Sequence, residues 1–285
     1  MKQFDDSKVL TIGAGGMVGS YVDFGLRPDS AALNILHKEE VLRYVQKHAP
    51  TAIIHLAGAT DMTRAEEDPL YAYERNVRGT YNVACAAREV GATMVYASTS
   101  RIFDGDKKTS YTEDDVPEPE TQYARTKYFG ELITQATAPK YIIARTSWVF
   151  GGGPKSDNKF YGNILKQLDQ PEIVALSDVY GSPTYGKDYI AAIKKMLEEE
   201  QTGIVHIANK GVASRYDLAH HMVQQLKPDI LVKKVNRSFF ASATNLPTNE
   251  SISSVRCALR PWQEALTEYV EAEWSSYLQS DKIIS

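Results

Sequence analysis

Residues 9–19 of the chain read VLTIGAGGMVG. The first four residues are apolar or β-branched, which predicts a short buried strand. Glycines follow at once at positions 13, 15, 16 and 19, and they predict a tight turn that leads into a helix. A strand, a turn and a helix in this order form the first unit of an α/β fold.

The spacing of Gly13, Gly16 and Gly19 has a mechanical explanation. The first glycine permits the tight turn, the second lets the backbone approach a pyrophosphate, and the third lets helix and strand pack closely. Such a motif also occurs in simple turns, but its place at the first strand favours a dinucleotide. The candidate cofactor-binding residues of the turn are Gly13, Gly16, Met17, Val18 and Gly19.

Strand and helix patterns alternate through the first half of the chain. Apolar runs at 52–56, 93–97 and 141–144 predict strands, and helical periodicity is found at 38–48, 71–90 and 122–135. Alternation of this kind is typical of βα units on a parallel sheet. We therefore expect a Rossmann-type, doubly wound NAD(P)-binding domain over residues 1–150.

The pattern loosens after Gly151. Helices are expected near 158–168, 187–199 and 215–226, with a strand near 173–176 and a closing amphipathic helix over 262–277. These elements predict a smaller C-terminal α/β substrate-binding region over residues 151–285, partly interleaved with the first.

Composition excludes several classes of partner. A net charge of −4 without a basic tract disfavours nucleic acid. No apolar stretch reaches the ~18 residues of a spanning helix, and the polar residues 1–7 lack the apolar centre of a signal peptide. Cys85 and Cys257 form neither a disulfide framework nor a metal-ligand spacing, so we expect a cytoplasmic protein without a bound metal.

The segment that should hold the adenosine ribose is short. Few residues separate Gly19 from the polar stretch 30–34, which leaves little room for a second strand. Arg27, Asp29 and Asn34 are the candidates there, and solvated loop residues are an equal alternative. The choice between NAD and NADP stays open.

A catalytic pair is suggested by Tyr123 and Lys127, which lie four residues apart in a helical pattern and so project from one face. A phenol is a weak acid at neutral pH unless a nearby cation stabilises its anion. The strand before it ends in Ser98-Thr99-Ser100, at the sheet edge where open α/β folds bind ligands. The three candidate catalytic residues are therefore Thr99, Tyr123 and Lys127.

With these motifs in place, the chain resembles the extended short-chain dehydrogenases, and within them the dTDP-4-dehydrorhamnose reductase family, along nearly its whole length. The likeness is carried by the glycine turn, Ala57–Glu66, Asn76, Ser98-Thr99 with Phe103 and Gly105, Tyr123–Lys127, Arg145-Thr146-Ser147-Trp148-Val149-Phe150 and Gly181-Ser182-Pro183-Thr184.

The resemblance implies reduction of the 4-keto group of a nucleotide-linked deoxysugar by NADPH or NADH, most simply dTDP-4-dehydrorhamnose to dTDP-rhamnose for a polysaccharide. It implies that Tyr123 is the acid that donates the proton, that Lys127 stabilises its anion, and that the Thr99 hydroxyl holds the substrate oxygen. The remaining implied contacts are Asn34, Ala57, Gly58, Thr60 and Asn76 for the cofactor, with Asn76 also supporting the catalytic helix, and Ser100, Arg101, Trp148 and Asn158 for the substrate.

Departures from the family fall mainly on the substrate side. Ser100-Arg101 replaces the usual Asp-Tyr, Arg215 replaces an aromatic residue, and Leu246 replaces an arginine that would suit a diphosphate.

Sugar-nucleotide epimerases and dehydratases share the cofactor domain and the Tyr/Lys pair, so they remain an alternative, as does a non-catalytic cofactor-binding subunit. A homodimer is one assembly that the sequence leaves open.

Overall fold

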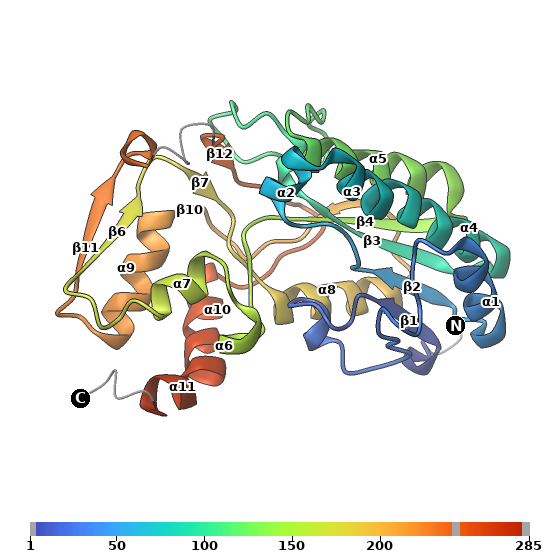
Figure 1. Cartoon of the computed structure of the whole chain (residues 1–285), viewed down its shortest axis with the longest axis horizontal. Coiled ribbons are helices and arrows are strands. Elements are labelled where there is room, and N and C mark those ends of the chain that lie inside the picture. Colours follow the sequence, from blue (N-terminus) through green and yellow to red (C-terminus); the bar gives the residue numbers. More distant parts are fainter. Residues whose placement is uncertain (1–3, 241–245, 281–285) are drawn as a thin grey trace.

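The computed structural model describes residues 4–240 and 246–280. The outermost residues of the two predicted regions, 1–3 and 281–285, lie outside this description. Figure 1 shows two parts side by side, a parallel sheet between helices and a smaller α/β part.

The central sheet has the strand order β1-β2-β3-β4-β9, and every neighbouring pair is parallel. This confirms the Rossmann-type prediction. The fifth strand comes from beyond residue 150, so the second half of the chain completes the sheet of the first. The strands are β1 (Val9–Ile12), β2 (Ala52–His55), β3 (Thr93–Thr99), β4 (Lys140–Thr146) and β9 (Gly203–His206).

Helices cover both faces of this sheet because successive side chains of each buried strand point to opposite sides. Leu10, Ile53 and Met94 pack toward α1 (Lys38–His48) and α4 (Thr80–Val90). On the other face, the neighbouring side chains pack against α8 (Gly186–Glu198). Figure 1 shows α8 on the opposite side of the sheet from α4 and α5 (Gln122–Thr137).

The prediction of a helix directly after the glycine turn is wrong. Residues 19–21 form a single 3-10 turn, η2 (Gly19–Tyr21), and the chain then continues outside any helix to Leu26, with a bend at residues 24–25. Leu26 forms one parallel bridge beside Leu10, a remnant of the shortened second strand. Val22 and Phe24 of this irregular segment pack into the core with α8, so they cover sheet surface that a helix would otherwise cover.

Two predicted helices are interrupted by wider π-helical turns. The pattern at 71–90 becomes α3 (Pro69–Tyr73), a π segment η3 (Glu74–Gly79) and then α4, with α2 (Met62–Glu67) before them. The closing pattern becomes α10 (Trp262–Tyr269), a π segment η7 (Val270–Trp274) and α11 (Ser275–Ser280).

The smaller part has its own apolar core, formed around a parallel strand pair, β6 (Glu172–Leu176) and β11 (Leu231–Val235). The helices α7 (Phe160–Leu165), α9 (Arg215–Leu226) and α10 contribute to that core. The remaining short elements are β5 (Val149–Phe150) with β8 (Thr184–Tyr185), β7 (Tyr180–Gly181) between β10 (Ala213–Ser214) and β12 (Asn249–Glu250), α6 (Gly153–Ser156), and the 3-10 turns η1 (Asp6–Lys8), η4 (Ser100–Ile102) and η5 (Arg237–Phe239).

The beginning of the chain is tied to its closing helix through one carboxylate. The phenols of Tyr21 and Tyr185 donate to Glu273 at 2.6 and 2.5 Å, and the Tyr21 oxygen also accepts from the backbone N–H of Gly152 at 2.6 Å. The residue that ends the short η2 turn is thereby fixed to the far end of the sequence.

Ser214 begins α9 with a capping box, since its hydroxyl accepts from the Asp217 N–H while the Asp217 carboxylate accepts from the Ser214 N–H. We expect Ser214→Ala to lower the free energy of unfolding by about 1 kcal/mol, the usual cost of losing such a cap. Urea denaturation measures the change. Ser276→Ala, at an exposed position of α11, is the control and should shift stability by less than about 0.5 kcal/mol; equal losses in both variants would contradict the capping role.

Candidate active site

A cavity of about 610 Å³ opens at the carboxyl ends of β1 and β2. Open α/β sheets bind their ligands at this edge. The predicted cofactor residues that line the cavity are Gly13, Gly16, Asn34, Ala57 and Gly58.

Two glycines of the turn shape this cavity in different ways. Gly13 has a φ of +92°, and a Cβ there would lie 2.6 Å from the Ala57 nitrogen, so only glycine fits. A Cβ at Gly16 would meet nothing nearer than the Gly13 oxygen at 3.4 Å. Since Gly16 lines the cavity, any longer side chain there would occupy space that a ligand would use.

The other residues predicted to bind the cofactor lie around the cavity and are not among its lining. Gly19 packs so closely against the Gly13 oxygen that a Cβ would collide with it, and Val18 packs into the core beside α8. Met17 lies against the Gly152 backbone, and Thr60 is exposed.

Asn76 is buried in the π segment η3 and links two parts of the site. Its side-chain oxygen accepts from the Ala59 N–H at 2.8 Å, and its amide donates to the Ala59 carbonyl and to the Thr126 hydroxyl at 3.1 and 3.0 Å. Asn76 therefore holds the loop after β2 against α5.

Of the three residues predicted near the ribose, Asp29 and Asn34 line the cavity, while Arg27 is turned away from it. The Arg27 guanidinium donates to the Val22 carbonyl at 2.6 Å. Asp29 and Asn34 line the cavity, and each also accepts backbone hydrogen bonds within its own loop. Arg75 lines the same cavity and was not predicted; its position next to Asn76 is the one sequence signal that could have indicated it.

Tyr123 and Lys127 lie in the first two turns of α5, beside the end of β3 where Thr99 stands. Burial raises the pKa of the Tyr123 phenol, while the Thr99 hydroxyl and the positive charge of Arg101 act in the opposite direction. The three predicted catalytic residues are thus on adjacent elements, and Thr99 is close enough to Tyr123 to influence its phenol.

The Lys127 ammonium is buried behind this pair. It donates to the Ala97 carbonyl at 2.6 Å and lies 4.2 Å from the centre of the Tyr96 ring. Burial lowers the pKa of Lys127 to about 8, although the nearby Glu131 carboxylate favours the charged form. The neighbouring His55, which is fully enclosed, has its pKa lowered to about 3 by burial and by Lys127, so it is neutral.

A buried ion pair fixes α5 on the sheet. Arg145 on β4 makes two hydrogen bonds to the Glu131 carboxylate of α5, at 3.0 and 2.7 Å, and the Ser98 hydroxyl donates to it at 2.5 Å. Both charged side chains are buried, at 2% and 0% exposure. Because an unpaired charge in this position would be costly, the pair holds α5 in register with β3 and β4.

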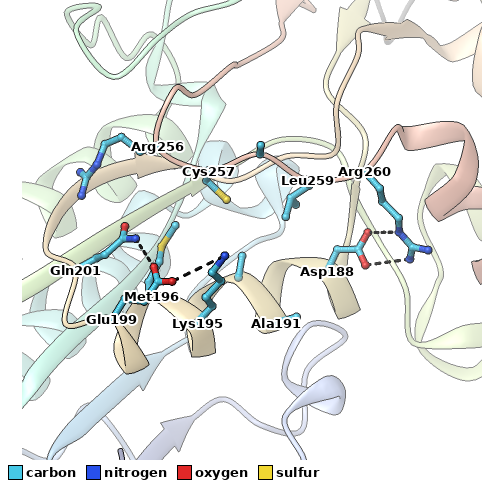
Figure 2. A pocket seen from close by; sticks show the side chains of 12 residues that line it. Asp188, Ala191, Lys195, Met196, Glu199, Gln201, Arg256, Cys257, Leu259 and Arg260 are labelled. Atoms are coloured by element: carbon cyan, nitrogen blue, oxygen red, sulfur yellow. Dashed lines mark hydrogen bonds and ion pairs between the residues drawn. The ribbon is translucent and has the colours of Figure 1, made fainter. Parts of the chain in front are cut away.

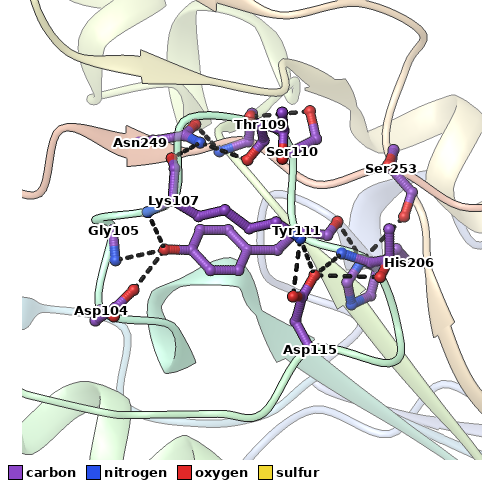
Figure 3. Close-up of polar contacts among 12 residues, drawn as sticks. Asp104, Gly105, Lys107, Thr109, Ser110, Tyr111, Asp115, His206, Asn249 and Ser253 are labelled. Carbon is purple, nitrogen blue, oxygen red and sulfur yellow. Dashed lines mark hydrogen bonds and ion pairs between the residues drawn. The ribbon is translucent and has the colours of Figure 1, made fainter.

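On the substrate side, Arg101 forms an ion pair with Glu250, whose carboxylate accepts from the guanidinium at 2.7 Å. Glu250 was not predicted from the sequence. It is placed by a network drawn in Figure 3, in which Asn249 donates to the carbonyls of Lys107 and Thr109. The loop after η4 and the strand β12 are therefore joined, and this brings Glu250 to Arg101.

Trp148 has an unusual backbone, with a φ of +39°, and its ring lies against Gly181. The guanidinium of Arg215 lies 3.8 Å above the centre of that ring. Of the other predicted substrate residues, Ser100 is buried at the start of η4. Asn158 is exposed, and its side-chain oxygen accepts a hydrogen bond from Lys166.

A second cavity, of about 390 Å³, lies between α8 and residues 256–260, away from these side chains. Figure 2 shows that its charged groups face one another, with Asp188 against Arg260 and Lys195 against Glu199. Arg256 donates to two backbone carbonyls. With its charges paired, this cavity offers little to a charged ligand.

The described residues contain neither a cluster of metal ligands nor a membrane-spanning helix. Within 4–240 and 246–280, no group of three or more histidine, cysteine or acidic side chains could hold a metal ion. Over the same ranges, the helices are too short or too polar to cross a bilayer.

Comparison with known proteins agrees with this geometry. The model of the RmlD substrate binding domain matches residues 7–274. The chain is 29% identical over 284 residues to the spore coat polysaccharide biosynthesis protein SpsK of Bacillus subtilis, covering 95% of this chain and 99% of the relative. It is 31% identical over 284 residues to the dTDP-4-dehydrorhamnose reductase of Mycolicibacterium smegmatis, covering 93% and 85%.

Among solved structures, the dTDP-4-dehydrorhamnose reductase from Bacillus anthracis in complex with NADP superposes with a TM-score of 0.85 at 30% identity, over 92% of this chain and 98% of that one. The predicted family resemblance is therefore confirmed, and the chain belongs to the RmlD substrate-binding family.

Proposed function

We propose that the chain is an NAD(P)H-dependent reductase that converts the 4-keto group of a nucleotide-linked deoxysugar to an alcohol, with dTDP-4-dehydrorhamnose as substrate and dTDP-rhamnose as product. The observation that carries the proposal is that Tyr123 and the buried Lys127, in the first turns of α5, lie beside Thr99 at the carboxyl end of β3. The similarity to dTDP-4-dehydrorhamnose reductases over most of the chain supports the choice of substrate.

The cavity fits a dinucleotide. Gly16 leaves room that a side chain would fill, while Gly13 lets the turn pack against the Ala57 backbone and Gly58 lets its loop pack against the Asn76 side chain. When bound, the nicotinamide supplies a hydride to the carbonyl carbon of the sugar. Gly13, Gly16, Ala57 and Gly58 would hold the cofactor, and Asn34, Asp29 or Arg75 would contact its adenosine end. The structure of the Bacillus anthracis relative supports NADP in this role.

The side chains around the sugar then handle the proton. Tyr123 donates its phenolic proton to the carbonyl oxygen as negative charge develops there, and the Thr99 hydroxyl holds that oxygen in place. The charged Lys127 stabilises the phenolate that Tyr123 becomes. Asn76 and the Glu131–Arg145 pair position the helix on which both residues stand.

An epimerase or a non-catalytic subunit is less well supported, because the Mycolicibacterium smegmatis relative and the Bacillus anthracis structure, at 31% and 30% identity, are named as reductases. We also propose that the chain works in the cytoplasm, which suits its two free cysteines. Assembly as a homodimer stays a prediction.

The proposal is tested by following nicotinamide absorbance with purified protein, NADPH or NADH, and dTDP-4-dehydrorhamnose generated in place. Oxidation of the nicotinamide that depends on the sugar nucleotide is the expected result. Cofactor binding without turnover on this substrate would contradict it and would direct attention to other keto-sugar nucleotides.

The lowered pKa of Lys127 predicts a particular pH dependence. Below about pH 8 the amine is charged and can assist Tyr123; above it the charge is lost, so kcat/KM should fall about tenfold per pH unit. Tyr123 keeps its proton through this range, since its own pKa is raised above the ordinary value of 10.0. A pH profile of kcat/KM measures the effect. Lys47→Met, on the exposed surface of α1, should keep the wild-type profile; a wild-type profile that is flat to pH 10 would remove Lys127 from this role.

A further inference from the structure

Arg215 is the first residue of α9 and stands where a cation is unfavourable. The backbone N–H groups at a helix amino end carry partial positive charge, so acidic side chains are preferred there and basic ones are not. Two further cations, Arg101 and Lys159, lie close by. The charge of Arg101 acts to lower the pKa of Arg215, and the charge of Arg215 acts to lower the pKa of Lys159. A cation in such a place is destabilising unless an anion joins it.

The guanidinium of Arg215 is held against two aromatic rings. Its central carbon lies 3.8 Å from the centre of the Trp148 ring and 4.7 Å from that of Phe160. Within residues 4–240 and 246–280, no hydrogen bond or ion pair to this guanidinium is formed. An arginine carries five N–H donors in a planar fork that suits carboxylate and phosphate oxygens, and within those ranges all five are unused.

The nearby Glu250 carboxylate favours the charged form of Arg215 but forms its ion pair with Arg101. Glu250 gives one oxygen to Arg101 at 2.7 Å, and its other oxygen is buried without a hydrogen-bond partner in the described chain. Glu250 is only 4% exposed and is fixed by the loop network of Figure 3, so it stays with Arg101. Arg101 is thus paired with a carboxylate, whereas the Arg215 guanidinium is not.

Arg215 also stands close to the proposed chemistry. The positive charge of Arg101 acts to lower the pKa of Arg215 and also that of the Tyr123 phenol. The Arg215 guanidinium is stacked on Trp148, which is one of the predicted substrate residues.

We propose that Arg215 binds an oxyanion of the substrate, with its fork oriented by Trp148 and Phe160, and that this contact selects anionic sugar nucleotides. The proposal rests on the proposed function for the identity of the nucleotide sugar. Two groups share the required chemistry: the diphosphate, and a carboxylate carried on the sugar. The unpaired guanidinium suits either negative group, and the binding experiments below show which of the two it contacts.

Calorimetric titration of dTDP into the wild type, Arg215→Met and Arg215→Lys tests the diphosphate. Charged hydrogen bonds of this kind correspond to at least about a tenfold loss of affinity in Arg215→Met, with a smaller loss in Arg215→Lys. Arg43→Met, exposed on α1, is the matched control and should bind dTDP as the wild type does. NADPH affinity should be equal in all four proteins, which shows that each variant is folded.

A second titration compares UDP-glucuronate with UDP-glucose. If dTDP affinity is unchanged in Arg215→Met but the preference for UDP-glucuronate is lost, the oxyanion is a sugar carboxylate. If neither quantity changes, Arg215 is not an anion site and the proposal is overturned. Failure of the reductase function is seen separately, as wild-type protein that binds dTDP through Arg215 yet does not turn over dTDP-4-dehydrorhamnose.

Discussion

Replacing Tyr123 by phenylalanine should lower kcat for keto-sugar reduction by roughly 100- to 10,000-fold, the range over which a positioned proton donor contributes to catalysis. The ring stays, so the packing of α5 is kept, but no acidic proton remains next to the Thr99 hydroxyl. Single-turnover absorbance measurements with saturating NADPH isolate this loss from substrate binding.

The dissociation constant for NADPH should not change in Tyr123→Phe, because the cavity is lined by other residues. Tyr81→Phe removes a phenol that is 44% exposed on α4 and serves as the control, with wild-type turnover. Wild-type kcat in Tyr123→Phe would show that another group donates the proton.

Placing leucine at Gly16 should weaken NADPH binding roughly 10- to 100-fold, which corresponds to the 1–3 kcal/mol that overfilling a packed site costs. The new side chain would extend into the cavity, while its Cβ would meet only the Gly13 oxygen, at 3.4 Å. Fluorescence titration with NADPH measures the affinity, and urea denaturation of the free protein should give wild-type stability.

Gly13→Ala provides the contrast within the same turn. Its Cβ would collide with the Ala57 nitrogen, and its φ of +92° is unfavourable for alanine, so this variant should lose stability as well as affinity. Wild-type NADPH affinity in Gly16→Leu would show that the cofactor phosphates do not lie over this glycine.

Much of the fold can be predicted from local sequence patterns. The helices at 38–48 and 215–226 occur at their predicted bounds, and the four predicted strands of the sheet are present with ends that differ from the prediction by at most two residues. These segments combine a clear period with residues that suit their ends, and α9 also has the Ser214 cap. In such cases local preference and tertiary packing agree.

The first βα unit was predicted less well because its glycine spacing specifies the turn but not the conformation of residues 20–26. Val22 and Phe24 lie two residues apart, a spacing that would put them on different faces of a helix, and both pack into the core beside α8 from a chain that is not helical. The interruption at 74–79 has a tertiary cause too: Asn76 is buried there, with hydrogen bonds to Ala59 and Thr126.

In the site, Thr99, Tyr123 and Lys127 could be predicted because a strand end and a helical spacing place them together. Glu250 could not, since its partner Arg101 is far away in the sequence and the two are joined only by the loop network around Asn249. The free guanidinium of Arg215 was equally hidden, because a sequence shows a charge but not whether it is paired.

The link between Tyr21 and Glu273 has a consequence for how the protein is made. The two residues are 252 positions apart, so the carboxylate that fixes Tyr21 is synthesised well after Tyr21 itself. At roughly 5–20 residues per second, translation needs about 13 to 50 s to reach it. During that interval a nascent chain has the glycine turn but lacks the anchor that holds η2 against Gly152. A transcript cut short before the codon for Glu273 would therefore yield a product in which Tyr21 lacks its carboxylate partner, although the deletion lies far from Tyr21 in the sequence.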